Sequence, residues 1–217
     1  MSLQSFGPAI GRILGTVVAE DAPGMDESLE KALLEMEAHD QTVRSELTAA
    51  GALDVTYHPR LEVVHRSNSS RLRQMIAVFG WPGVSLVGDQ GAKAAWRIAL
   101  HSIGEPAFMR QCRDLIDKAS QDGDAPRWQF AMIDDRIRVY EGKPQRYGTQ
   151  LRLGPNGLEP HPIENAERIN SMRAQAGLPA LAKTLAQARA QPQPPAAEQA
   201  AREAAELEFR RSAGWLT

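Results

Sequence analysis

The chain has 217 residues, 42% of them hydrophobic, which suits one domain with an appendage or at most two small domains. Its 25 Lys and Arg residues nearly balance 27 Asp and Glu residues, giving a net charge of −2. This balance argues against a nucleic-acid partner, which requires clustered basic residues. The single cysteine, Cys112, excludes an intramolecular disulfide and a Cys-based zinc site.

Residues 1–24 are predicted as a separate N-terminal segment, because residues 21–24 have a loop-forming composition. Residues 6–19 are mildly apolar, but they are too few to span a bilayer and follow no basic leader. No other stretch is apolar enough to be a transmembrane helix. We therefore expect no membrane association and a cytoplasmic location.

Residues 25–185 are predicted as a single, mainly helical domain. Its first helix covers residues 26–50, with Asp26 as the N-cap and Gly51 at the end. The apolar positions of this helix recur at spacings of four and three residues, and Asp40 occupies one of them. Arg44 follows one turn later on the same side.

Three further helices are predicted over residues 59–79, 90–103 and 106–123. Proline before or at the first turn marks the start of the first and third of these helices. Short helices are also expected over residues 163–176 and 178–190. After residue 123 the hydrophobic period changes to two, since Ile137 and Val139 alternate with arginines. This alternation predicts a small antiparallel β-hairpin at about residues 135–153, packed on the helices. The expected fold class is mainly α (α+β).

The C-terminal part, residues 186–217, is predicted as a proline-rich linker followed by a tail helix over residues 196–211. The tail helix has few apolar anchors, namely Leu207 and Phe209. We expect it to be exposed or weakly docked, and an appended helix of this kind can bind a protein partner.

Two runs of residues together resemble a bacterial family of unknown function over about residues 30–185. They are Gly-Trp-Pro at 80–82 and the run at 135–150, which ends in Tyr-Gly-Thr-Gln. The resemblance implies a mostly helical domain and supplies no activity. Members often have a Gln-His-Ala-Asp-like run in the third helix. Only the histidine, His101, is matched here.

His101 and Asp40 are the candidate catalytic residues. His101 lies at the boundary between the polar and apolar faces of its predicted helix, where an imidazole could transfer protons near neutral pH. Asp40 lies on a buried stripe, and a buried acid must be paired or hydrogen-bonded. The alternatives are a structural histidine and a structural ion pair between Asp40 and Arg44.

The candidate substrate-binding residues can donate directional hydrogen bonds or bind an anion. They are Arg44, Arg136, Gln145, Tyr147, Thr149 and Gln150. Trp81, in a Gly-Trp-Pro-Gly loop, is included as a candidate lid or pocket wall. Gly148 would let a ligand or a second backbone segment approach closely. The alternative is a solvated sheet face of alternating polar residues.

No metal site is predicted, because the five histidines form no His-x-His or His-Glu-x-x-His motif. A site of two histidines and a carboxylate, from His58 or His65 with His101 and Asp40, could arise only through folding. The sequence names no cofactor.

Two functions remain open. The first is an enzyme that processes a small molecule, an anionic or amide-bearing substrate, by hydrolysis or group transfer. The second is a non-catalytic binding or protein-interaction module. The enzyme requires His101, Asp40 and residues 147–150 to line one pocket.

Overall fold

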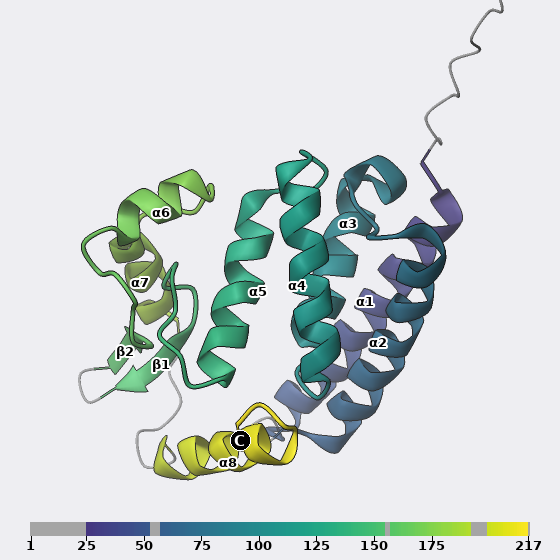
Figure 1. The fold of residues 1–217 in the computed structure, drawn as a ribbon. Helices are drawn as coiled ribbons and strands as arrows, with labels where there is room; N and C mark the ends of the chain where they lie inside the picture. Colours follow the sequence, from purple (N-terminus) through teal and green to yellow (C-terminus); the bar gives the residue numbers. More distant parts are fainter. Residues whose placement is uncertain (1–24, 53–56, 155–156, 192–198, 217) are drawn as a thin grey trace, which may run out of the picture.

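The computed structural model describes residues 25–52, 57–154, 157–191 and 199–216. Within these ranges the chain forms eight helices and one two-stranded antiparallel sheet (Figure 1). The predicted fold class, mainly helical with a small hairpin and a C-terminal helix, is confirmed. The predicted N-terminal segment and most of the predicted linker lie outside the described residues.

Five helices form the main bundle. They are α1 (Glu27–Ala49), α2 (Pro59–Phe79), α3 (Val84–His101), α4 (Pro106–Gln121) and α5 (Arg127–Tyr140). Helix α3 packs against the other four. Its buried side chains include Ala92, Ala95 and Ala99, and these small residues allow neighbouring helices to approach closely. The C-terminal end of α3 therefore lies where side chains of several helices can meet.

Local signals explain where the helices begin. The Asp26 carboxylate accepts hydrogen bonds from the N–H groups of Ser28 and Leu29, which caps α1. Gly88 has a φ of 67° and interrupts α3 after its first turn, which is why the periodic pattern predicts a start near residue 90. None of the described helices is long and apolar enough to cross a membrane.

The predicted strand at residues 135–140 was wrong, because these residues form the second half of α5. Phe130, Ile133 and Ile137 recur at helical spacing and are buried against the bundle. The alternation around Ile137 was too short to distinguish a strand from a helix. The hairpin lies later in the chain, where β1 (Leu151–Gly154) pairs with β2 (Gly157–Pro160).

Two short helices follow the hairpin, α6 (Ile169–Gln175) and α7 (Leu181–Arg189), and α7 packs on β2. Figure 1 shows this group on the side of α5 away from α4. The predicted helix over residues 163–176 was therefore too long at its N-terminal end. Residue 163 instead forms an isolated bridge with Gln145.

The tail helix, α8 (Gln199–Ser212), lies across one end of the bundle (Figure 1). No described side chain within α8 is buried, so the helix itself is exposed as predicted, but the tail beyond its end is held more firmly than expected. Trp215 is only 4% exposed, and its indole N–H donates to the Ile103 carbonyl at 2.7 Å. Phe209 contacts the rings of Tyr57 and Tyr140 edge to face. The aromatic residues thus anchor the tail to the bundle.

Candidate functional site

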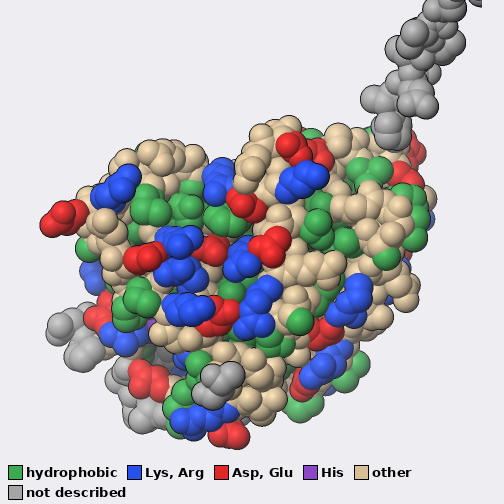
Figure 2. Space-filling view, viewed as in Figure 1, with side chains coloured by type: hydrophobic (Ala, Val, Ile, Leu, Met, Phe, Trp, Pro, Cys, Tyr) green, Lys and Arg blue, Asp and Glu red, His purple; other side chains and the backbone are tan. Residues whose placement is uncertain are grey.

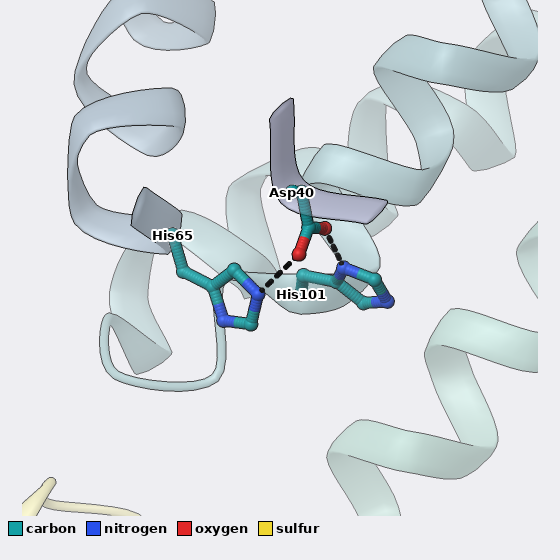
Figure 3. Close-up of side chains that lie close together, drawn as sticks. All are labelled: Asp40, His65 and His101. Carbon is teal, nitrogen blue, oxygen red and sulfur yellow. Dashed lines mark hydrogen bonds and ion pairs between the residues drawn. The ribbon is translucent and has the colours of Figure 1, made fainter. Parts of the chain in front are cut away.

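Three side chains from three helices meet inside the bundle (Figure 3). Asp40 of α1 has one carboxylate oxygen 3.1 Å from His65 Nε2 of α2. Its other oxygen is 2.5 Å from Nδ1 of His101, the last residue of α3. Asp40 and His65 are buried, whereas the His101 side chain keeps 16% of its surface exposed. We call these residues the His-Asp-His cluster.

The helices place the cluster by their own periodicity. Asp40 continues the buried stripe of α1 that includes Met36, Val43 and Leu47. His65 occupies the corresponding position on the buried face of α2. The two histidines therefore provide the hydrogen-bond donors that a carboxylate needs at a buried position.

The hydrogen-bond network determines where the protons are. Burial alone would raise the pKa of Asp40, but the hydrogen bonds from His101 and His65 outweigh it and lower the pKa well below its usual range. A carboxylate only accepts hydrogen bonds, so His101 Nδ1 and His65 Nε2 must both carry hydrogen. Burial lowers the pKa of His101, although Asp40 partly opposes this effect. His101 is therefore neutral near pH 7, with a free lone pair on Nε2.

Tyr57 extends the network on the side of His65. Its hydroxyl lies 2.6 Å from His65 Nδ1. Burial raises the pKa of Tyr57, so the hydroxyl keeps its proton. When His65 carries hydrogen on Nε2 alone, its Nδ1 accepts a hydrogen bond from this hydroxyl. In this tautomer the Tyr57 hydroxyl donates to His65 Nδ1, and His65 Nε2 donates to Asp40.

His101 and His65 line a pocket of about 350 Å³, a size that fits a small molecule. Residues from α1, α2, α3 and α5 and from the loops before α2 and after α3 surround it. The lining residues are Arg44, Tyr57, His58, Leu61, His65, His101, Ile103 and Arg136. In Figure 3 the second ring nitrogen of His101 points away from Asp40.

Two arginines predicted as substrate-binding residues line this pocket. Arg136 Nη1 donates to the Leu100 carbonyl at 3.0 Å, and its Nε donates to Gln150 Oε1 at 3.3 Å. The Nε atom of Arg44 is buried and has no hydrogen-bond partner within the described residues. The alternative of an Asp40–Arg44 ion pair is not observed, since both oxygens of Asp40 bind histidines.

The Tyr-Gly-Thr-Gln run surrounds a different carboxylate. Asp135 is fully buried and accepts hydrogen bonds from the N–H groups of Arg146, Tyr147 and Thr149, and from the Thr149 hydroxyl. Burial raises the pKa of Asp135, and these hydrogen bonds lower it in part. Tyr147 and Thr149 therefore bind Asp135 through their backbone and do not line the pocket. Gly148, with a φ of 65°, approaches the side chain of Leu181.

Gln145 and Gln150 complete this loop. The buried amide of Gln145 donates to the carbonyls of Gln150 and His161, and accepts from the N–H of Gln150. Gln150 in turn holds Arg136. These glutamines do not line the pocket. Gln150 contacts the lining residue Arg136, and Gln145 holds Gln150.

Trp81 lies apart from the site. It precedes the N-terminus of α3, whereas His101 is the last residue of that helix, and it packs against the main core. The structure therefore unites Asp40, His101, Arg44 and Arg136, and separates Trp81, Tyr147 and Thr149 from them. The expectation that residues 147–150 line the same pocket as His101 was wrong, because these residues hold Asp135 and Arg136 instead.

Two further residues matter for the site: His65, which the sequence offered only as one possible member of a metal site formed by folding, and Tyr57, which was not predicted. A signal for His65 exists in the sequence, because it continues the stripe of Leu61, Asn68 and Leu72 on α2. A polar residue at such a position requires a partner, as with Asp40. Tyr57 precedes α2 and has no periodic signal of this kind.

The His-Asp-His cluster is also the group that could hold a metal ion. One ligand atom from each residue lies within 4.8 Å of the others. Histidine nitrogen and carboxylate oxygen are the ligands of many zinc and non-haem iron sites. An ion would have to displace the two hydrogens that now join the histidines to Asp40.

Comparison with known protein families identifies the family to which this chain belongs. A family model described as a family of unknown function, DUF6624, matches residues 27–189, which include the His-Asp-His cluster and the whole pocket. Comparisons with curated proteins and with solved structures found no match. The match covers most of the chain and ends before α8. The chain therefore belongs to the DUF6624 family.

Proposed function

We propose that this protein is an enzyme that processes a small molecule, with His101 as the residue that transfers protons. The observation that carries the proposal is the position of the Asp40 carboxylate between two histidines, of which His101 is partly exposed and lines the pocket. This arrangement supports a neutral imidazole with an oriented lone pair.

The chemistry follows from the proton positions. His101 Nε2 takes a proton from a water molecule or a substrate hydroxyl as its oxygen attacks, and then gives the proton to the leaving group. The imidazolium formed in between is stabilised by Asp40, which already accepts from Nδ1. Asp40 is thus a positioning residue, and the reaction class is hydrolysis or group transfer.

His65 contributes by fixing the carboxylate. Its Nε2 donates to one Asp40 oxygen, so that the other oxygen stays directed at His101. Tyr57 fixes His65 in the tautomer that donates to Asp40. Both residues would affect the rate through the orientation of His101.

The test is turnover by the full chain with a panel of chromogenic esters, amides and phosphate esters. We expect His101→Gln to lower turnover by about 10²- to 10⁴-fold without unfolding the protein. The control is His39→Gln, because His39 is exposed and precedes Asp40 on α1. Undiminished turnover by His101→Gln would overturn the proposal. Ligand binding without turnover for every substrate class would favour a binding module.

A second candidate is a metal-dependent enzyme, and the closeness of the three ligand atoms supports it. Titration of the chelator-treated chain with Zn²⁺ or Mn²⁺ tests it. A stoichiometric site that is lost in His65→Ala and kept in His39→Ala would support this candidate. Full turnover in excess chelator would exclude it.

A further inference from the structure

We infer that the pocket binds a small oxyanion, a carboxylate or a phosphate group, through Arg44 and Arg136. This inference rests on the proposed function and specifies its substrate class. The two guanidinium groups come from different helices, α1 and α5, and line the same pocket as His101.

The positive charges in the pocket have no carboxylate counter-ion in the part of the chain that the structure describes. Among the described residues no carboxylate forms an ion pair with Arg44 or Arg136. The Asp40 carboxylate is bonded to two histidines. Burial raises the pKa of Tyr57 and Tyr140, and two nearby acids raise it further, Glu62 that of Tyr57 and Glu206 that of Tyr140. Each acid is already paired with another arginine, Glu62 with Arg66 and Glu206 with Arg210.

Arginines on the protein surface can have carboxylate partners, unlike the two arginines of the pocket. On the face shown in Figure 2, basic and acidic side chains lie next to one another. Arg138 and Arg146, for example, share the carboxylate of Glu164 at 3.0 and 2.9 Å. Arg138 and Arg146 thus have a carboxylate partner, whereas neither pocket arginine has one among the described residues.

Each pocket arginine also has unused hydrogen-bonding capacity. Within the described ranges Arg136 is bonded to two neutral acceptors, the Leu100 carbonyl and the Gln150 amide, although a guanidinium carries five N–H donors. The buried Nε of Arg44 has no acceptor in the part of the chain described. Buried donors without acceptors are rare in folded proteins. An oxyanion in the pocket would supply acceptors and negative charge together.

These features favour an anion over a neutral amide. An amide would supply one acceptor and leave both charges uncompensated, whereas carboxylate and phosphate oxygens match the guanidinium fork. The lone pair on His101 Nε2 would repel an anionic oxygen. The ligand is therefore expected to direct its anionic group to the arginines and an O–H group, or a water molecule, to His101.

Calorimetry and thermal denaturation of the full chain, with inorganic phosphate, sulfate, acetate and neutral acetamide as probes, test the inference. We expect phosphate or acetate to bind and raise the Tm, and acetamide to do neither. The relative affinities of phosphate and acetate identify the preferred oxyanion. Arg44→Gln and Arg136→Gln should each weaken binding about ten-fold or more. Arg60→Gln, an exposed arginine paired with Glu46, should bind normally.

Absence of binding by all the anions, or equal binding by wild type and Arg44→Gln, would overturn the inference. Arg44→Gln keeps the test valid if Arg136→Gln unfolds, since the Arg44 side chain makes no hydrogen bond or ion pair with the described residues. The two proposals fail separately. Anion binding without His101-dependent turnover would refute only the proposed function, and His101-dependent turnover without anion binding would refute only this inference.

Discussion

Asp40 is the residue on which the site depends, because its two oxygens bind two different histidines. An asparagine at this position has one oxygen and one NH₂ group, so it can accept from only one of them. We expect Asp40→Asn to turn His101 into the tautomer with hydrogen on Nε2. Turnover should fall on the order of 10²- to 10⁴-fold, while phosphate binding by the arginines persists. Unchanged turnover would contradict the role of Asp40.

Asp135 has a structural role of the same kind. Asp135→Ala would leave three backbone N–H groups and the Thr149 hydroxyl without their acceptor. We expect the free energy of unfolding to fall by about 3 kcal/mol or more in urea denaturation. Asp114→Ala is the matched control, because Asp114 is 68% exposed, and it should change stability by less than about 0.5 kcal/mol. Equal effects of the two substitutions would refute this role.

At the scale of elements, the C-terminal tail should stabilise the bundle mainly through Trp215, which follows α8. Trp215 is buried in the main core, whereas Leu207 on the same tail is 37% exposed. Trp215→Ala should lower the free energy of unfolding by about 3 kcal/mol, and Leu207→Ala by much less. Chemical denaturation of both variants measures the difference. A Trp215→Ala protein as stable as wild type would show that the tail does not dock in solution.

Helices with clear caps and a long apolar stripe could be predicted from the sequence, as α1 shows. Its N-cap Asp26 and its stripe are local features. The strand predicted at residues 135–140 failed because a few alternating residues carry too little periodic information. The anchoring of the C-terminal tail could not be predicted, since it depends on residues distant in the sequence. Phe209 contacts the rings of Tyr57 and Tyr140, and Trp215 donates to the Ile103 carbonyl.

The candidate site was predictable to a similar extent. The positions of Asp40 and His101 on their helices follow from periodicity. Their contact depends on how α1 and α3 pack, which no local pattern contains. The polar run at residues 145–150 suggested a binding surface, but its groups are used to hold Asp135 and Arg136. The concentration of polar residues at 145–150 therefore marked a loop that holds buried side chains next to the pocket, and not a surface that lines it.

For the whole molecule, the buried cluster predicts lower stability in acid. The pKa of His101 is below its usual value of 6.5 in the folded chain, so the unfolded chain takes up this proton at a higher pH. The free energy of unfolding must then fall as the pH drops below 6.5. The contribution of Asp40, whose pKa is lowered, is lost only below its usual value of 3.8.

Urea denaturation over this pH range measures the effect. His101→Gln should have a shallower pH dependence than wild type between pH 6.5 and 3.8. Some dependence should remain, because burial also lowers the pKa of His161. A His101→Gln profile with the same slope as wild type would contradict the assignment.

The proposed function depends on three helices, which bring an imidazole and two guanidinium groups to one pocket and a carboxylate to that imidazole. The most direct test of this account is the protonation state of His101, read from the imidazole ¹⁵N chemical shifts of the full chain at neutral pH and assigned with His101→Gln. We predict hydrogen on Nδ1, which donates to Asp40, and none on Nε2. A His101 ring with hydrogen on Nε2, whether neutral or cationic, would contradict the account.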